Sequence, residues 1–173
     1  VLFTTVYNGR RDPRCHRTVS MFVTTLPVLC HRAGDLSVAE YLSALKEQML
    51  GSMANDLYSF AELSADTGIT SDVQFVWQAD MLSLPKGSTL KLKREKLPFI
   101  ATGDPLSVQL FPEEDKLVFH VQYHADRYSE EYIVRFAGCM NQVLKDMMVK
   151  NKLLDISLIS DEERKEILTL SKG

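Results

Sequence analysis

Residues 18–29 read TVSMFVTTLPVL, a run in which nearly every side chain is apolar or β-branched. Such a run is typical of a strand that helices cover on both faces, because neither face then needs polar side chains. The sequence therefore predicts a central β-strand in a sheet. Pro27 is expected to end its pairing, since proline has no N–H to donate to a neighbouring strand.

Other elements are predicted around this strand in the first half of the chain. Residues 1–7 alternate like a strand and end at Asn8-Gly9, a strong turn signal. Ser37 and Glu40 form a capping box, the signature of a helix start, and an apolar pattern of helical period follows. The remaining elements predicted there are a short helix over 60–65, stopped near Gly68, and a strand over 72–79.

The second half of the chain predicts a hairpin followed by a helix. Residues 106–110 and 117–123 each alternate between apolar and polar side chains, which favours an antiparallel pair. From Ser129 to about Lys150 the apolar residues recur at helical spacing. The other predictions are an exposed arm or edge hairpin over 85–103, a short strand over 153–159, and a helix from Asp161 opened by Ser160 and Glu163. The order of elements indicates an α/β fold, with a mixed sheet covered by helices.

Composition limits the classes of function. The chain has 173 residues, 45% hydrophobic and 25% charged, which is enough apolar material for one core. Its net charge of -3 leaves no basic excess, so nucleic acid is not an expected partner. No apolar run approaches the roughly 20 residues that span a bilayer, and no signal pattern opens the chain, so we expect a cytoplasmic protein without membrane contact. The strand-like start at Val1 favours a piece of a longer protein.

The usual signatures of catalysis and metal binding are missing from the sequence. The cysteines Cys15, Cys30 and Cys139 include no CxxC pair, so we expect neither a disulfide framework nor a zinc site. There is no GxSxG elbow for a nucleophilic serine and no glycine-rich phosphate loop. We therefore assign no catalytic and no metal-binding residue.

Residues 120–126, HVQYHAD, loosely resemble the HHxxxDG signature of acyltransferases in which a histidine acts as general base. In that signature the two histidines are adjacent, whereas His120 and His124 are four positions apart on a predicted strand. We interpret this strand as surface-facing or partner-facing, and the role of the two histidines stays open.

Three patterns, in order, resemble the condensation domains of nonribosomal peptide synthetases. Residues 7–10 (YNGR) and 18–27 (TVSMFVTTLP) are similar to the family's GR element and its VGxFVNTLP motif, with Thr24 in the place of the asparagine. Residues 55–62 (NDLYSFAE) resemble (H/N)QDYPFE, with Ser59 in the place of the proline. The motif positions are Gly9, Arg10, Met21, Phe22, Asn55, Asp56, Tyr58 and Phe60.

The resemblance implies a fold of two chloramphenicol acetyltransferase-like lobes with a tunnel between them. The family's HHxxxDG motif belongs to the N-terminal lobe, so this chain is expected to be a C-terminal lobe fragment without the base. Residues 1–159 are then the C-terminal part of the condensation domain, and 160–173 begin the linker toward an adenylation domain. The tunnel candidates are Thr24, Thr25 and Gln78. Because neighbours on a strand alternate, one threonine is expected to face the helices and the other the tunnel.

By the same resemblance, the complete domain forms amide bonds between aminoacyl or peptidyl thioesters held on carrier proteins. The implied partners are the N-terminal lobe, the adenylation domain and the upstream and downstream carriers, which bear 4'-phosphopantetheine, while the fragment itself binds no cofactor. Two alternatives remain. One is a lobe of a coenzyme A-dependent acyltransferase, and the other is a non-catalytic interaction lobe of a degenerate condensation domain.

Overall fold

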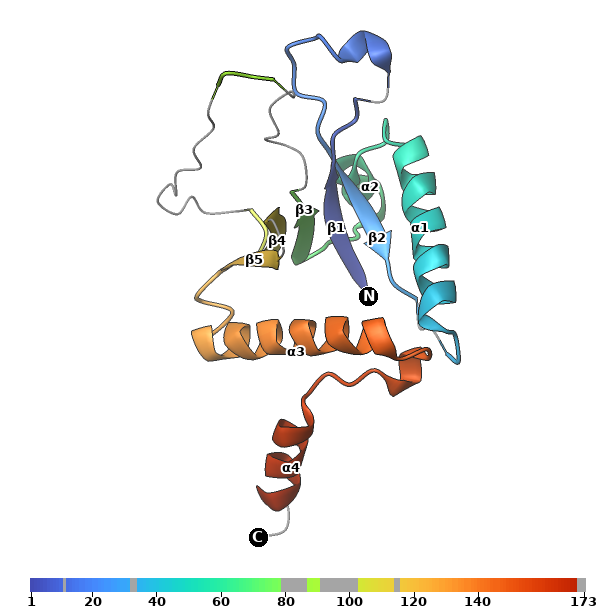
Figure 1. Ribbon diagram of the computed structural model, residues 1–173. Coiled ribbons are helices and arrows are strands. Elements are labelled where there is room, and N and C mark those ends of the chain that lie inside the picture. Colours follow the sequence, from blue (N-terminus) through green and yellow to red (C-terminus); the bar gives the residue numbers. More distant parts are fainter. Residues whose placement is uncertain (11, 32–33, 79–86, 91–102, 114–115, 171–173) are drawn as a thin grey trace. The chain divides into compact units, whose positions relative to one another are not determined.

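The computed structural model describes all residues except 11, 32–33, 79–86, 91–102, 114–115 and 171–173 (Figure 1). The chain forms two compact units. The first consists of Val1–Leu29 and Ser52–His124, and the second of Cys30–Gly51 and Ala125–Gly173. Most of the segment predicted as an arm or edge hairpin, residues 85–86 and 91–102, lies outside the described residues.

The first unit is built on a five-stranded sheet in the order β2-β1-β3-β4-β5 (Figure 1). The strands are β1 (Leu2–Tyr7), β2 (Thr24–Leu29), β3 (Val73–Trp77), β4 (Leu106–Glu113) and β5 (Lys116–Tyr123). The strands β1, β3 and β4 are parallel to one another, whereas β2 and β5 run antiparallel to their neighbours. The mixed sheet and the β4–β5 hairpin are therefore confirmed.

The strand pairing assigns each side chain of the sheet to one of two faces, because successive residues point to opposite sides. The apolar face holds most of the core, and its buried members are Leu26, Val28, Leu106, Val108 and Leu110. Phe3 and Phe75 meet edge to face on it, with ring centroids 6.4 Å apart. The polar face carries Thr4, Thr25, Gln74, Ser107, Gln109, His120 and Gln122, together with Val6 and the buried Val76.

The prediction of a central strand over residues 18–29 is wrong in extent and in position. Only Thr24–Leu29 is a strand, and it lies at the edge of the sheet beside β1. Pro27 is inside the strand, opposite Thr4, rather than at its end. An edge strand tolerates proline because one of its sides pairs with no other strand among the described residues. The apolar residues before it belong to a loop, in which Val19 and Met21 are exposed.

The helix of the first unit, α2 (Phe60–Thr67), begins and ends as its sequence predicts. Ser59 and Glu62 form a reciprocal capping box, and the chain leaves the helix at Gly68 with φ of 72°. Positive φ is the conformation that glycine adopts without steric cost. The helix packs against β2.

The second unit is helical. It contains α3 (Glu130–Val149), α4 (Asp161–Leu170) and most of α1 (Val38–Ala54), and the predicted starts of all three are confirmed. The strand predicted over 153–159 is wrong, because Leu153–Asp155 forms a 3-10 turn, η2. The backbone N–H of Ile156 donates to the Leu153 carbonyl, and strand-like pairing in this segment is limited to an isolated bridge between Ser37 and Lys152. Among the described helices, none is long and apolar enough to cross a membrane.

Candidate functional site

The parallel strands β1, β3 and β4 end at the same edge of the sheet, where α/β folds commonly bind ligands. Strand β2 starts at this edge, since Thr24 is paired with Tyr7, the last residue of β1. Gln78 follows β3, and its backbone N–H donates to the carbonyl of Leu110 at 2.9 Å. The topology thus brings the candidates Thr24 and Gln78 to one edge. We call this edge, with the 8–23 loop that joins β1 to β2, the strand-end site.

Arg10 organises the loop of the strand-end site. Its Nη1 donates to the carbonyls of Cys15 at 2.6 Å and Thr18 at 2.9 Å, and its Nη2 to that of Ser20 at 2.8 Å. The guanidinium also lies over the Phe22 ring, 4.6 Å from its centroid. The planar fork of arginine suits several fixed acceptors and an aromatic face at once. Arg10 therefore holds the loop in a closed form by bonding to its backbone.

Gly9 allows the backbone at the start of the loop to lie close to the backbone at Phe22, near its end. Its φ is 68°, and a Cβ added there would lie 2.3 Å from the carbonyl oxygen of Phe22. No side chain fits in that distance, and an L-residue is strained at this φ. The pair Gly9-Arg10, chosen from the sequence by resemblance, thus has a physical role in shaping the loop ahead of β2.

A short 3-10 turn, η1 (Pro13–Cys15), stiffens the outer part of the loop. The Asp12 carboxylate accepts hydrogen bonds from the side chain and the backbone N–H of Arg14, and these bonds lower the pKa of Asp12. Nε2 of His16 lies 3.1 Å from the carbonyl oxygen of Arg10. The described contacts of this turn are internal to the loop, so they stabilise its shape.

Thr24 and Thr25 lie on opposite faces of β2, as predicted. Thr24 shares the apolar face with Leu26, and Thr25 lies on the polar face. Both side chains are half-buried, and in the described part of the structure neither hydroxyl takes part in a hydrogen bond. Thr25 is paired with Val6 of β1 on that face.

The second group of motif positions builds the junction between α1 and α2. The Tyr58 hydroxyl donates to an Asp66 carboxylate oxygen at 2.5 Å, and this bond raises the pKa of Tyr58. The backbone N–H of Tyr58 donates to the Asn55 carbonyl, and Phe60 starts α2 after the Ser59 cap. These positions fix the start of a helix that packs on β2, so their described contacts are structural.

Sequence reasoning missed the polar face as a group. Gln109 and Gln122 are joined side chain to side chain at 3.4 Å, and the rings of Phe111 and His120 lie 4.7 Å apart. Ser107 is completely buried, and its hydroxyl has no partner in the described part of the chain. Alternation of polar residues is visible in each strand, but only the register across strands shows that they share one face.

The two histidines of the rejected HHxxxDG match are separated by the fold. His120 lies on the polar face of β5, whereas His124 follows the strand, and its backbone N–H donates to the Pro105 carbonyl at 2.9 Å. Burial raises the pKa of the neighbouring Asp104, while the charge of His124 acts in the opposite direction. Among the described residues no cluster of histidine, cysteine and carboxylate side chains is suited to a metal ion.

The chemistry available at the strand-end site is hydrogen bonding and positioning. Both terminal nitrogens of Arg10 donate to backbone carbonyls, which gives this residue a role in the shape of the loop. The Thr25 hydroxyl and the Gln78 amide are neutral groups that can both donate and accept hydrogen bonds. Such groups suit an uncharged ligand that contains amide or ester groups.

Comparison with known proteins gives a consistent picture. A family model described as "Condensation domain" matches residues 1–168. Bacitracin synthase 2 of Bacillus licheniformis is 29% identical over 92% of this chain, which spans 6% of that protein. Gramicidin S synthase 2 of Brevibacillus brevis is 27% identical over 92% of this chain, which spans 4% of it. The chain thus corresponds to a small part of these relatives.

Two solved structures share the fold. A holo four-domain nonribosomal peptide synthetase bound to AMP and glycine superposes with a TM-score of 0.77 at 14% identity, covering 95% of this chain and 14% of that one. The first condensation domain of the CDA synthetase gives a TM-score of 0.67, also at 14% identity, over 92% of this chain and 38% of that one. The chloramphenicol acetyltransferase-like fold expected from the sequence is confirmed.

Proposed function

Because the chain belongs to the condensation-domain family, we propose that it is the C-terminal part of a condensation domain of a nonribosomal peptide synthetase. Such a domain joins an aminoacyl or peptidyl thioester to a second aminoacyl group by forming an amide bond. The observation that carries the proposal is the family match over residues 1–168, together with the loop that Gly9 and Arg10 hold beside β2.

In this proposal the strand-end site is one wall of the tunnel in which donor and acceptor meet. Thr25 and Gln78 supply hydrogen bonds to the uncharged amide groups of the 4'-phosphopantetheine arms, which belong to the carrier proteins. Holding an amine beside a thioester makes the reaction nearly unimolecular, which lowers the barrier by roughly 7–11 kcal/mol in well-organised sites. The general base is supplied by the HHxxxDG motif of the N-terminal lobe.

The proposed organisation places residues 1–159 in the condensation domain and 160–173 at the start of a linker toward an adenylation domain. The partners are then the N-terminal lobe, the adenylation domain and the two carrier proteins, in the cytoplasm. A non-catalytic interaction lobe is the second candidate. It is favoured by Thr24 and Ser59, which replace the asparagine and proline of the family's motifs.

The proposal is tested with the full-length protein and with donor and acceptor amino acids loaded on the carrier proteins. We expect a carrier-bound amide product, detected by mass spectrometry of the intact carrier. In the matched control, the two adjacent histidines of the HHxxxDG motif in the N-terminal lobe are replaced by alanine. This variant should form no amide product. Loaded carriers that remain unreacted in the unsubstituted protein would favour the non-catalytic candidate instead.

A further inference from the structure

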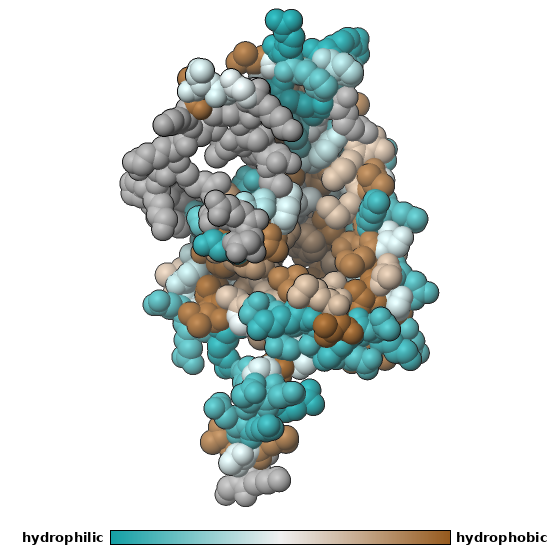
Figure 2. Space-filling view, viewed as in Figure 1, coloured by the Kyte–Doolittle hydropathy of each residue, from teal (hydrophilic) through white to brown (hydrophobic). Residues whose placement is uncertain are grey.

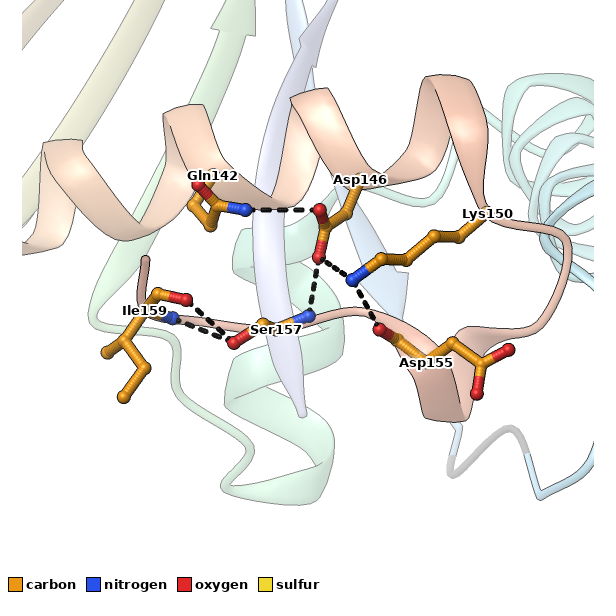
Figure 3. Close-up of polar contacts among 6 residues, drawn as sticks. All are labelled: Gln142, Asp146, Lys150, Asp155, Ser157 and Ile159. Carbon is orange, nitrogen blue, oxygen red and sulfur yellow. Dashed lines mark hydrogen bonds and ion pairs between the residues drawn. The ribbon is translucent and has the colours of Figure 1, made fainter. Parts of the chain in front are cut away.

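A buried carboxylate connects α3 to the segment that leads into α4 (Figure 3). Asp146 lies near the end of α3, and only 6% of its surface is exposed. A buried charge is costly unless several donors surround it, because it has lost its hydration. Asp146 is also a poor choice for a helix interior, so its position calls for a structural reason.

Three donors satisfy the Asp146 carboxylate. Nε2 of Gln142 donates to Oδ1 at 3.0 Å, and Nζ of Lys150 donates to Oδ2 at 2.7 Å. The backbone N–H of Ser157 also donates to Oδ2, at 2.8 Å. Gln142 belongs to α3 and Lys150 is the cap residue that follows its last turn, so these two donors lie one helical turn on either side of Asp146. The third comes from the segment after the helix, so the carboxylate fastens that segment to α3.

Lys150 strengthens the same connection. Its Nζ donates to the carbonyl of Asp155 at 2.7 Å while it holds Asp146 (Figure 3). A single ammonium group therefore bonds to the helix and to the following segment at once. We call Asp146, Lys150 and the residues 155–157 that they hold the α3 clamp.

The clamp is continued by contacts that reach α4. The Ser157 hydroxyl donates to the Ile159 carbonyl at 2.7 Å, which shapes the two residues before the helix. Ser160 then caps α4 by accepting from the N–H of Glu163 at 3.2 Å. A carboxylate oxygen of Glu163 lies 3.6 Å from Nη2 of Arg135 on α3. Described contacts thus follow the chain without a gap from α3 to the first turn of α4.

Apart from these contacts, packing does little to hold the helix α4 in place. Six of its ten residues are charged, and teal and brown patches alternate on this helix in Figure 2. None of its residues is buried, and Ile167, Leu168 and Leu170 are exposed. A short helix that buries no apolar face gains little from packing, and its orientation depends on the contacts at its ends. The clamp supplies such contacts at the N-terminal end.

We propose that Asp146 is a positioning residue, which fixes the direction in which the chain leaves α3 and so makes α4 a rigid extension of the second unit. A consequence, which rests on the proposed function, is that the clamp sets the geometry between the condensation domain and the domain that follows. The residues after α3 are then a fixed spacer that transmits position, rather than a loose tether.

Hydrogen exchange measured on the full-length protein tests the clamp without any activity assay. Asp146→Asn keeps the size of the side chain but removes its charge, and Lys150→Met removes the cation. Each should accelerate exchange about tenfold or more at the Ser157 amide and throughout α4, because charge-assisted bonds are lost. The matched controls Asp126→Asn and Lys145→Met, at exposed positions, should leave these rates unchanged. A faster Ser157 amide with unchanged rates in α4 would overturn the proposal.

The inter-domain consequence is tested in the same samples by two activities. Condensation turnover should fall about tenfold or more in Asp146→Asn, while amino-acid-dependent pyrophosphate exchange by the adenylation domain stays at the wild-type rate. Equal condensation rates in the variant and the wild type would overturn this consequence. An unsubstituted protein without condensation activity would instead refute the proposed function, and the exchange data would still decide the clamp.

Discussion

The guanidinium of Arg10 lies over the ring of Phe22 and donates to three backbone carbonyls of the loop between these two residues. Lysine has neither the planar fork nor the reach to make all of these contacts. Arg10→Lys should therefore lower the free energy of unfolding by about 1–3 kcal/mol, measured by denaturant titration. The control is Arg17→Lys, the same change at an exposed position of the same loop, which should have no measurable effect. Equal responses would contradict the role of Arg10.

A second prediction concerns Gly9. Alanine at this position would adopt an unfavourable φ and place its Cβ against the Phe22 carbonyl oxygen. We expect Gly9→Ala to destabilise the protein by about 1–3 kcal/mol. Gly138→Ala is the control, because no atom lies within 4 Å of the added Cβ in α3. It should raise stability by up to about 1 kcal/mol, since alanine favours helices. Thermal unfolding that moves both variants in the same direction would disprove this role of Gly9 in the loop.

The two threonines of β2 should respond differently to a larger side chain. Thr24→Leu overpacks the apolar face beside Leu26 and should cost about 1–3 kcal/mol of stability. Thr25→Leu changes the polar face and should lower condensation turnover in the full-length protein with little effect on the melting temperature. If melts and turnover change alike at both positions, Thr25 does not belong to the tunnel wall.

Asp146 gives a prediction about pH. The hydrogen bond from Lys150 and that from the Ser157 amide lower the pKa of Asp146 in the folded protein. A carboxyl group with a lowered folded pKa stabilises the fold above its unfolded pKa, and this stabilisation is lost as the pH falls through the folded value. The stability difference between wild type and Asp146→Asn should therefore be constant above about pH 5 and shrink below about pH 4. A difference as large at pH 3 as at pH 7 would show that the charge of Asp146 is not its source.

The sequence predicted the elements that have one apolar and one polar face, because such elements show a clear sequence period. The β4–β5 hairpin and α3 each have one apolar side, so alternation or helical spacing identifies them without further information. The run over 18–29 lacks such a pattern, because its first half is an exposed loop and its second half an edge strand. Exposed apolar residues such as Val19 and Met21 cannot be distinguished from buried ones by composition alone.

The candidate site was predictable only in part, for a related reason. The family motif selects Gly9 and Arg10, but the carbonyls that Arg10 holds are backbone atoms, which leave no mark in the sequence. The polar face needs the register of four strand pairs, and long-range pairing is not encoded locally. The α3 clamp likewise depends on the backbone N–H of Ser157, eleven positions from Asp146.

The most direct test of the central claim separates the two proposed lobes. The 173-residue chain, shown by circular dichroism to be folded, is incubated with donor and acceptor loaded on carrier proteins, with and without the N-terminal lobe that carries HHxxxDG. The proposed function predicts no amide product from the chain alone and product when both lobes are present. Amide formation by the isolated chain above background would contradict it.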